Sequence, residues 1–470
     1  MVYEIGLFVP HYLMKYFVIF LIGIAILPLL VQSVHSLELD TSSYSLKQQI
    51  KEGWDIESLF CHNDQVLILK ITDESPACVN PETAVKLVDR GWGIMPATIT
   101  PIEVNSKNII EANNQFALDF YSKVSSDDEK NIFFSPTSIS IAFAIAYEGA
   151  RGNTADEINQ AFGFPKNDEE RRNAYFAMIE QLNEKDAKYK LRIANALWLA
   201  EGFEPFQEYV NTAKTYYDSE VSTVNFLTDG IDIINDWVKT KTEEKIKQLF
   251  PPGSGDSSTR MAITNAIYFK GTWVEQFDEE QTKMDDFRVN QQTVVKVPMM
   301  ELKTTFLNYT RNDQLEILEL PYEGDKLSML ILLPTSVDGI KSLEESLTTD
   351  NLNQWAGKLR KAKTKVFMPK FTLETEYGLI PVLKELGIHD AFGNADFSGI
   401  SESDLFIEKA IHKAFVDVNE EGTEAAAATG IIMAESAPVP FRADHPFIFI
   451  IQDKETGNIL FIGKIVDPTA

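Results

Sequence analysis

The residues most able to do chemistry in this chain are its serines, its carboxylates and a few histidines. A serine hydrolase needs a histidine base beside its nucleophile, and the chain has no Gly-x-Ser-x-Gly pattern. The lone triplet Gly253-Ser254-Gly255 lacks the rest of a phosphate-binding loop, and 70 acidic residues make paired carboxylates ordinary surface. These patterns predict a protein that is not an enzyme and needs no cofactor. Four histidines follow the apolar N-terminal segment: His62, His389, His412 and His445.

The two cysteines, Cys61 and Cys78, offer a second kind of chemistry. Residues 62–77 separate them, and a disulfide closing such a loop is worth about 3 kcal/mol in the chain-entropy model. A metal site lacks ligands, because His62 is the only nearby histidine. We therefore predict a disulfide in an exported module and no metal site, with two free thiols as the alternative.

A run of small residues at positions 420–429, Glu-Glu-Gly-Thr-Glu-Ala-Ala-Ala-Ala-Thr, is the most informative stretch. Alanine alone favours a helix, but residues 411–418 and 446–451 on either side are rich in β-branched and aromatic residues and are expected to be strands. Side chains alternate along a strand, so one face of the run would carry only small residues while Glu424 points the other way. Such a segment can enter an existing sheet, with Gly422 as its pivot. The inward face would hold Thr423, Ala425, Ala427 and Thr429.

Several further motifs occur in a fixed order from about Asn113 to the end of the chain. The motifs are Asn131-Ile132-Phe133-Phe134-Ser135-Pro136-Thr137-Ser138-Ile139-Ser140, Gly149-Ala150-Arg151-Gly152-Asn153-Thr154, Asn265-Ala266-Ile267-Tyr268-Phe269-Lys270-Gly271-Thr272-Trp273, Pro369-Lys370-Phe371, Leu386-Gly387-Ile388, Ala395-Asp396-Phe397-Ser398 and Phe461-Ile462-Gly463-Lys464. Together with the small-residue run these motifs resemble the serpin family, and so many matches in order are very improbable by chance.

The resemblance implies a mixed α/β (α+β) serpin fold with three β-sheets, about nine helices and an exposed reactive-centre loop at about residues 420–441. It also implies a suicide-substrate inhibitor of serine, or cysteine, endopeptidases. The protease attacks the loop and forms an acyl-enzyme, and the cleaved arm then inserts into the central sheet and distorts the protease. A non-inhibitory binding or carrier protein of the same fold is the alternative. The inserting hinge is assigned to Glu421, Gly422, Thr423, Glu424, Ala425, Ala426, Ala427 and Ala428.

The resemblance also assigns a gating role to a group of polar residues. His412 is expected to be a buried strand histidine that joins Ser135, Ser138 and Asn265 under the central sheet. Because an unpaired buried polar group costs roughly 1 to 3 kcal/mol, such a network can hold the sheet closed until the loop enters. Trp273 is expected in the core, at the place where the loop first enters.

Two counts place the scissile bond differently. Counting from the hinge gives Ser436-Ala437, which predicts elastase-like or subtilisin-like targets; Glu435-Ser436 is an alternative that favours a glutamate-preferring protease. Counting back from Phe441 gives a site near Ile432. We prefer the count from the hinge, since the length of the inserting arm fixes the distance between the hinge and the scissile bond.

The chain is expected to be exported and to have three parts. Residues 1–36 contain an apolar stretch typical of a signal peptide, or of a membrane anchor if it is not cleaved. Residues 37–112 form a small Cys61-Cys78 module with a linker, and residues 113–470 form the serpin-like domain. The net charge of −27 argues against a nucleic-acid partner and favours a monomer. Asn308-Tyr309-Thr310 matches a glycan acceptor pattern.

Overall fold

The chain forms two compact units in a computed structural model, residues 1–103 and 104–470. The structure describes residues 45–51, 59, 61, 65–70, 75–80, 83–84, 86–87, 90, 92–94, 107–126, 129–183, 188–256, 258–421 and 437–470. Ten α-helices and three sheets occur in this part of the chain, which confirms the predicted mixed α/β fold. None of these helices is long and apolar enough to cross a membrane.

The first unit contains a small antiparallel sheet in the order β2-β1-β3. Its central strand, β1, is apolar, and Leu67, Ile68 and Leu69 are buried. A disulfide joins Cys61 to Cys78, as predicted, and Cys78 lies opposite Leu67 in the sheet. Among the described residues of this unit, Leu59 and Ala84 are also buried. The elements are α2 (Leu46–Lys51), β1 (Val66–Lys70), β2 (Pro76–Val79) and β3 (Gly93–Ile94).

Nine of the α-helices belong to the second unit. The first of them begins at Lys107, and Ile109 and Ile110 are buried in its first turn. The helices are α4 (Lys107–Val124), α5 (Pro136–Gly149), α6 (Gly152–Phe162), α7 (Asp168–Leu182), α8 (Gln207–Tyr217), α9 (Gly230–Lys241), α10 (Ile340–Glu345), α11 (Thr349–Ala356) and α12 (Leu379–Glu385), with 3-10 turns at η3 (Glu279–Gln281) and η4 (Asp390–Phe392).

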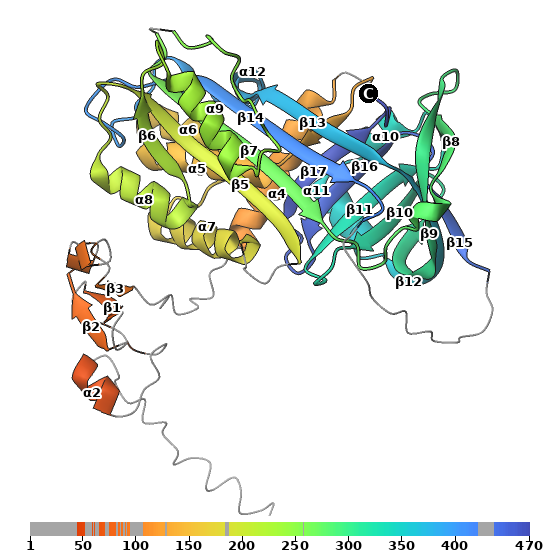
Figure 1. Ribbon diagram of the computed structural model, residues 1–470, viewed down its shortest axis with the longest axis horizontal. Coiled ribbons are helices and arrows are strands. Elements are labelled where there is room, and N and C mark those ends of the chain that lie inside the picture. Colours follow the sequence, from red (N-terminus) through yellow and green to blue (C-terminus); the bar gives the residue numbers. More distant parts are fainter. Residues whose placement is uncertain are drawn as a thin grey trace, which may run out of the picture. The chain divides into compact units, whose positions relative to one another are not determined.

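A five-stranded sheet runs through the part of the second unit where most helices gather (Figure 1). Its strand order is β13-β14-β7-β5-β6, and β14 and β7 are parallel to each other. β7 is antiparallel to β5, while β13 is antiparallel to β14. The strands are β5 (Tyr189–Ala200), β6 (Glu220–Val224), β7 (Met261–Gly271), β13 (Phe371–Gly378) and β14 (Ile407–Val418).

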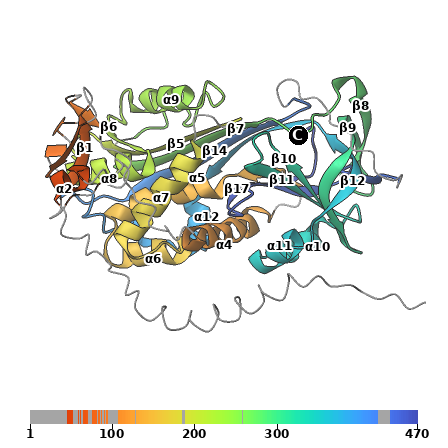
Figure 2. The same ribbon diagram turned by 90° about the horizontal axis from the view of Figure 1, so that it is seen from below.

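Helices cover both faces of this sheet, with α9 on one face and α5 on the other (Figure 2). Successive side chains of β5 point to opposite faces of the sheet, so each helix layer has its own apolar contacts. Leu197 and Leu199 pack in the cluster that contains α5, whereas Ala196 and Trp198 pack with Ile234 of α9. The central strands are therefore buried on both sides.

The second sheet of this unit has nine strands, including the chain's C-terminal strands. Its order is β15-β12-β9-β10-β11-β16-β17-β4, and β8 pairs with β9 off this path. The strands are β4 (Ile132–Phe134), β8 (Lys283–Arg288), β9 (Val294–Arg311), β10 (Leu315–Pro321), β11 (Leu327–Pro334), β12 (Arg360–Pro369), β15 (Val439–Arg442), β16 (Phe447–Asp453) and β17 (Ile459–Ile465).

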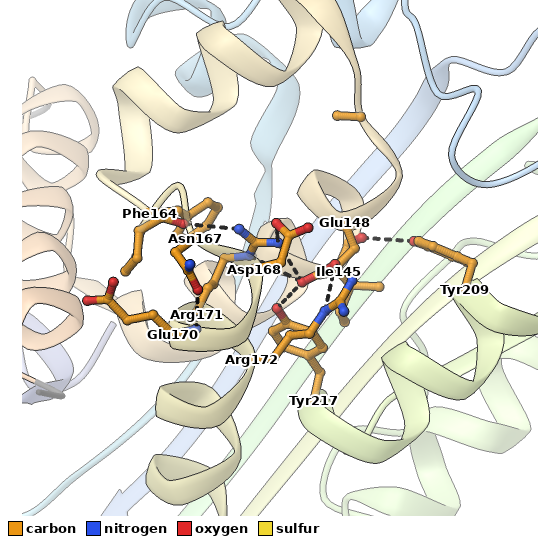
Figure 3. Close-up of polar contacts among 12 residues, drawn as sticks. Ile145, Glu148, Phe164, Asn167, Asp168, Glu170, Arg171, Arg172, Tyr209 and Tyr217 are labelled. Carbon is orange, nitrogen blue, oxygen red and sulfur yellow. Dashed lines mark hydrogen bonds and ion pairs between the residues drawn. The ribbon is translucent and has the colours of Figure 1, made fainter. Parts of the chain in front are cut away.

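A buried ion cluster fixes three helices to one another (Figure 3). The Glu148 carboxylate of α5 is paired with Arg171 and Arg172 of α7, each at 2.7 Å. Tyr217 of α8 donates its hydroxyl proton to the same carboxylate at 2.6 Å. A buried carboxylate needs such partners, because an unpaired buried charge is strongly destabilising. The cluster therefore holds α5 in place, and the N-terminal end of α5 positions Ser135 and Ser138.

Candidate functional site

The two parallel strands β7 and β14 lie side by side in the middle of the five-stranded sheet, and we call their junction the seam. Met261 is opposite Ile407 at one end of the seam, and Phe269 is opposite Val416 at the other. Asn419 follows β14 and is followed by Glu420 and Glu421. Glu421 is the first residue of the predicted hinge, so the described chain leaves the sheet at one end of the seam.

Four of the residues predicted to gate the sheet meet under the middle of the seam. The backbone N–H of Ser135 donates to Nε2 of His412 at 3.1 Å, and Nδ1 of the ring is hydrogen-bonded to Asn265 Oδ1. Nδ2 of Asn265 donates to the carbonyl oxygen of Ser138 at 2.9 Å and to its hydroxyl at 2.5 Å. All four are fully buried. We call this group, Ser135, Ser138, Asn265 and His412, the latch, because it links both strands of the seam to the N-terminus of α5.

The protonation state of His412 follows from its partners. Nε2 accepts a hydrogen bond, so the proton of the neutral ring lies on Nδ1 and is donated to Asn265. Burial lowers the pKa of His412 to about 3, because a dry site disfavours the imidazolium. His412 is therefore neutral at working pH. Its ring connects Asn265 of β7 with the backbone of Ser135 before α5.

The latch extends one strand further, to a residue that sequence reasoning missed. Asn195 of β5 lies opposite Asn265 of β7, and its Oδ1 accepts from Asn265 Nδ2. Nδ2 of Asn195 is buried and has no partner among the described residues. Leaving such a donor unsatisfied costs roughly 1–3 kcal/mol. The closed seam thus has free energy to gain from a rearrangement that supplies an acceptor.

Trp273 lies at the end of the seam where the loop departs, apart from the latch. Its indole Nε1 donates to the backbone carbonyl of Asn419 at 3.0 Å, and its ring stacks on Tyr322 with centroids 4.4 Å apart. Asn419 follows β14 directly, so Trp273 holds the point at which the chain leaves the sheet.

Glu420 is held beside Trp273 by two contacts that were not predicted. Its carboxylate pairs with Lys370 Nζ at 2.7 Å and accepts from the Thr282 hydroxyl at 2.7 Å. Burial alone would raise the pKa of Glu420, but these hydrogen bonds lower it, and the bond to Glu420 raises the pKa of Lys370. The next residue, Glu421, lies 3.7 Å from Lys270 of β7. The base of the loop is therefore fixed to the sheet by charge.

The other end of the loop is fixed to the second sheet. β15 pairs in parallel with β12 at the edge of the nine-stranded sheet, and Phe441 is fully buried. Arg442 is ion-paired with Asp285 and, at 3.3 Å, with Asp444. The predicted C-terminal end of the loop, at residue 441, thus lies within a strand. The loop connects two different sheets, so its N-terminal arm can enter the seam only if the chain between them is cut or β15 detaches.

The segment after α9 closes the outer face of the seam. Nζ of Lys245 lies 5.7 Å from the ring of Tyr268 on β7 and 5.8 Å from that of Phe415 on β14, two residues that face each other across the seam. Lys413 donates to the carbonyl oxygen of Gln248 at 3.0 Å. The seam is therefore bridged on both faces, by the latch beneath it and by this segment above it.

Several predicted positions fall outside the described residues. These are the hinge from Gly422 to Ala428, Ile432, Glu435 and Ser436; Ala437 is described and precedes β15. Among described residues, no histidine ring is hydrogen-bonded to a serine hydroxyl, and no group of three or more potential metal ligands occurs.

Comparison with known proteins agrees with this architecture. The model of the family described as "Serpin (serine protease inhibitor)" matches residues 111–468. An uncharacterized serpin-like protein of Methanosarcina acetivorans is 39% identical over 409 residues, covering 84% of this chain and 94% of the relative. The leukocyte elastase inhibitor of Sus scrofa is 41% identical over 373 residues, covering 76% of this chain and 98% of the relative.

Solved structures give the same result. Uncleaved ovalbumin superposes with a TM-score of 0.71 at 32% identity, covering 77% of this chain and 100% of ovalbumin. Human thyroxine-binding globulin, solved in complex with its hormone, also gives 0.71, at 31% identity, over 78% of this chain and 100% of the globulin. The family match, the relatives and the fold agree: the chain belongs to the serpin (serine protease inhibitor) family.

Proposed function

We propose that this protein is a suicide-substrate inhibitor of serine endopeptidases that traps the acyl-enzyme by inserting its cleaved reactive-centre loop into the seam. The observation that carries the proposal is the seam itself. β7 and β14 are parallel neighbours with no strand between them, and the loop leaves from the end of β14. The chain is not itself a catalyst in this proposal, and the protease supplies the nucleophile.

The strand directions make insertion favourable. An arm that reverses after β14 runs antiparallel to β14, and because β7 is parallel to β14 it also runs antiparallel to β7. Insertion replaces one parallel ladder with two antiparallel ones, and antiparallel pairing is the more stable per residue. Each added hydrogen bond contributes on the order of 1 kcal/mol, and burial of the alanine methyl groups adds to this.

The barrier to insertion comes from the contacts that bridge the seam. The latch must open, the Trp273–Asn419 hydrogen bond must adjust, and the segment after α9 must move away from Tyr268 and Phe415. Insertion also carries the N-terminal side of the loop away from β15, which stays paired with β12. The uncleaved protein is therefore held in its higher-energy form until a protease cuts the loop.

We place the scissile bond at Ser436-Ala437, with Glu435-Ser436 as the alternative. A small residue before the bond suits the narrow pockets of elastase-like or subtilisin-like proteases. The relative named leukocyte elastase inhibitor supports a protease target of this general kind. We further propose that residues 1–36 export the chain and that residues 37–112 are a separate disulfide-closed module on a monomeric inhibitor.

The test is incubation of the purified protein with elastase-like, subtilisin-like, trypsin-like and glutamyl proteases. A denaturing gel reports covalent complexes, and the mass of the released C-terminal peptide identifies the scissile bond. We expect a denaturant-stable complex with at least one protease of the first two classes. Clean cleavage by every protease, without a complex and without a gain in thermal stability, would contradict the proposal.

A binding or carrier function is the second candidate, favoured by the likeness to thyroxine-binding globulin. The second unit has an open groove of about 920 Å³ between α4, α11, β11 and β16, with Ile110, Leu352 and Ile450 among its lining residues. A carrier would bind a small ligand without loop cleavage. Absence of complexes in the protease test, together with ligand-dependent thermal stabilisation, would favour this function.

A further inference from the structure

A basic strand lies beside the C-terminal anchor of the loop, in a chain whose net charge is −27. Residues 358–365, Lys-Leu-Arg-Lys-Ala-Lys-Thr-Lys, hold five cations and no acid, and from Arg360 they form β12. β12 is hydrogen-bonded directly to β15, where Val439 pairs with Thr364. Neighbouring strands are about 4.8 Å apart, so these cations lie next to the chain that emerges from the loop.

The strand's alternation separates its two faces. Thr364 and Val366 are fully buried, whereas Lys361, Lys363 and Lys365 point to the opposite, solvent-facing side. We call Lys361, Lys363 and Lys365 the lysine stripe. Alternate residues on a strand are about 7 Å apart, so the stripe places three ammonium groups on one narrow surface about 14 Å long.

The stripe is only partly neutralised by the protein itself. Lys365 is paired with Glu301 at 2.7 Å, but no described carboxylate lies within ion-pair distance of Lys361 or Lys363. Glu319 on this face of the sheet is two strands away from β12, buried, and engaged by Asn308 and Ser328. The unpaired ammonium groups of Lys361 and Lys363 give this surface a positive potential, which attracts an acidic partner.

An exposed aromatic residue belongs to the same surface. Phe306 of β9 lies directly opposite Lys363, so its side chain is on the same face, and it is 50% exposed. Aromatic residues surrounded by charge are typical of protein–protein contacts rather than of binding to extended polyanions. An extended polyanion would also be repelled by the strongly acidic remainder of the chain. A compact protein surface is the better fit.

We infer that the lysine stripe with Phe306 is a secondary contact site for the target protease, and that this protease carries an acidic patch beside the part of its cleft that receives the loop residues after the scissile bond. This inference rests on the proposed function, since it requires a protease on the loop. A protease holding residues at and after Ala437 lies over β15 and therefore close to β12. The stripe steers the protease onto the loop and raises the rate of encounter.

The test compares rates of loop attack by the protease that the preceding experiment identifies. The charge variant is Lys361→Gln with Lys363→Gln, and the matched control is Lys166→Gln with Lys214→Gln, which removes two exposed lysines near α7 and in α8, at the other end of this unit (Figure 1). The measured quantity is the second-order rate of total loop attack, the sum of complex formation and cleavage, at low and at physiological ionic strength.

We expect the charge variant to lose roughly three- to tenfold in rate at low salt and the control to lose none, with the loss shrinking as salt rises. Lys361→Glu with Lys363→Glu should lose more. Equal rates for wild type and charge variant at low salt would overturn the inference. Salt-dependent retention of dextran sulfate by wild type but not by the charge variant, with protease rates unchanged, would overturn it in favour of a polyanion.

This design separates the inference from the proposed function. The ratio of complex to cleaved product tests inhibition, whereas the total rate tests the stripe and remains measurable for a protease that only cleaves. Phe306→Ser provides an independent variant, expected to slow loop attack at both ionic strengths because its contribution is apolar. Urea midpoints equal to wild type confirm that each variant is folded.

Discussion

At the scale of single residues, the site is a set of buried polar groups whose partners come from different elements. His412 binds a backbone N–H of the helix below and an amide of the neighbouring strand. Replacing Asn265 leaves a buried ring nitrogen of His412 without its partner, which destabilises the closed seam. In the proposed mechanism, the same few hydrogen bonds therefore set both the stability of the closed seam and the barrier to insertion.

Acidification should destabilise the closed form through His412. In the folded protein its pKa is about 3, whereas in the unfolded chain it is near 6.5, so the unfolded state binds the extra proton between these values. The contribution of His412 to stability is complete above about pH 6.5 and is lost as the pH falls toward 3, by at most about 1.4 kcal/mol per pH unit. As the pH is lowered from 7.5 to 4.5, the urea midpoint of wild type should therefore fall more steeply than that of His412→Gln. Parallel plots of midpoint against pH for the two proteins would contradict this account.

The contact between Glu420 and Lys370 should control how firmly the loop base is held. Lys370→Met leaves a nearly buried carboxylate without its charged partner, and we expect a loss of roughly 1–3 kcal/mol in unfolding free energy. Exchanging the charges, Glu420→Lys with Lys370→Glu, should recover part of the unfolding free energy that either single charge reversal loses. The double-mutant cycle gives the coupling. A coupling near zero would show that the pair does not secure the loop base.

At the scale of elements, the seam is the decisive feature of the proposed mechanism, because a strand inserted between this parallel pair would run antiparallel to both of its neighbours. The helices supply the frame. α5 carries Ser135 and Ser138 of the latch, and the Glu148 cluster fixes α5 to α7 and α8. The frame can therefore stay fixed while the two halves of the sheet separate.

Insertion requires small, uncharged side chains on the inward face of the hinge. Thr423→Arg places a cation on that face, which costs several kcal/mol if it is buried unpaired, so the protease should deacylate before insertion is complete. Glu424→Arg is the matched control, because strand alternation predicts that this side chain lies on the opposite face of the inserted arm. We expect the first variant to be cleaved as a substrate and the second to keep its inhibitory stoichiometry. Equal stoichiometries would contradict the predicted alternation.

At the scale of the whole molecule, much of the architecture was predictable because ordered motifs identified the fold and four latch residues. Asn195 was missed because a single asparagine in an apolar strand has no periodic signature. The Glu420–Lys370 pair was missed because the two residues are distant in sequence and meet only where the turn after β12 comes close to the end of β14.

The central claim, that the cleaved loop enters between β7 and β14, can be tested by locking the seam. Ala266 and Lys413 are opposite each other in this ladder, at a spacing that a disulfide can bridge. The variant Ala266→Cys with Lys413→Cys should therefore form a reversible crosslink across the seam. Each single variant, and wild type treated with the same reductant, control for side-chain loss and for reduction of the Cys61–Cys78 bond.

The measurement is the fraction of protease captured in a denaturant-stable complex by the oxidised and by the reduced form of this double variant. We predict that the oxidised form is cleaved without capturing the protease and that reduction restores capture to the level of the single variants. Equal capture by the oxidised and reduced forms would contradict loop insertion at the seam.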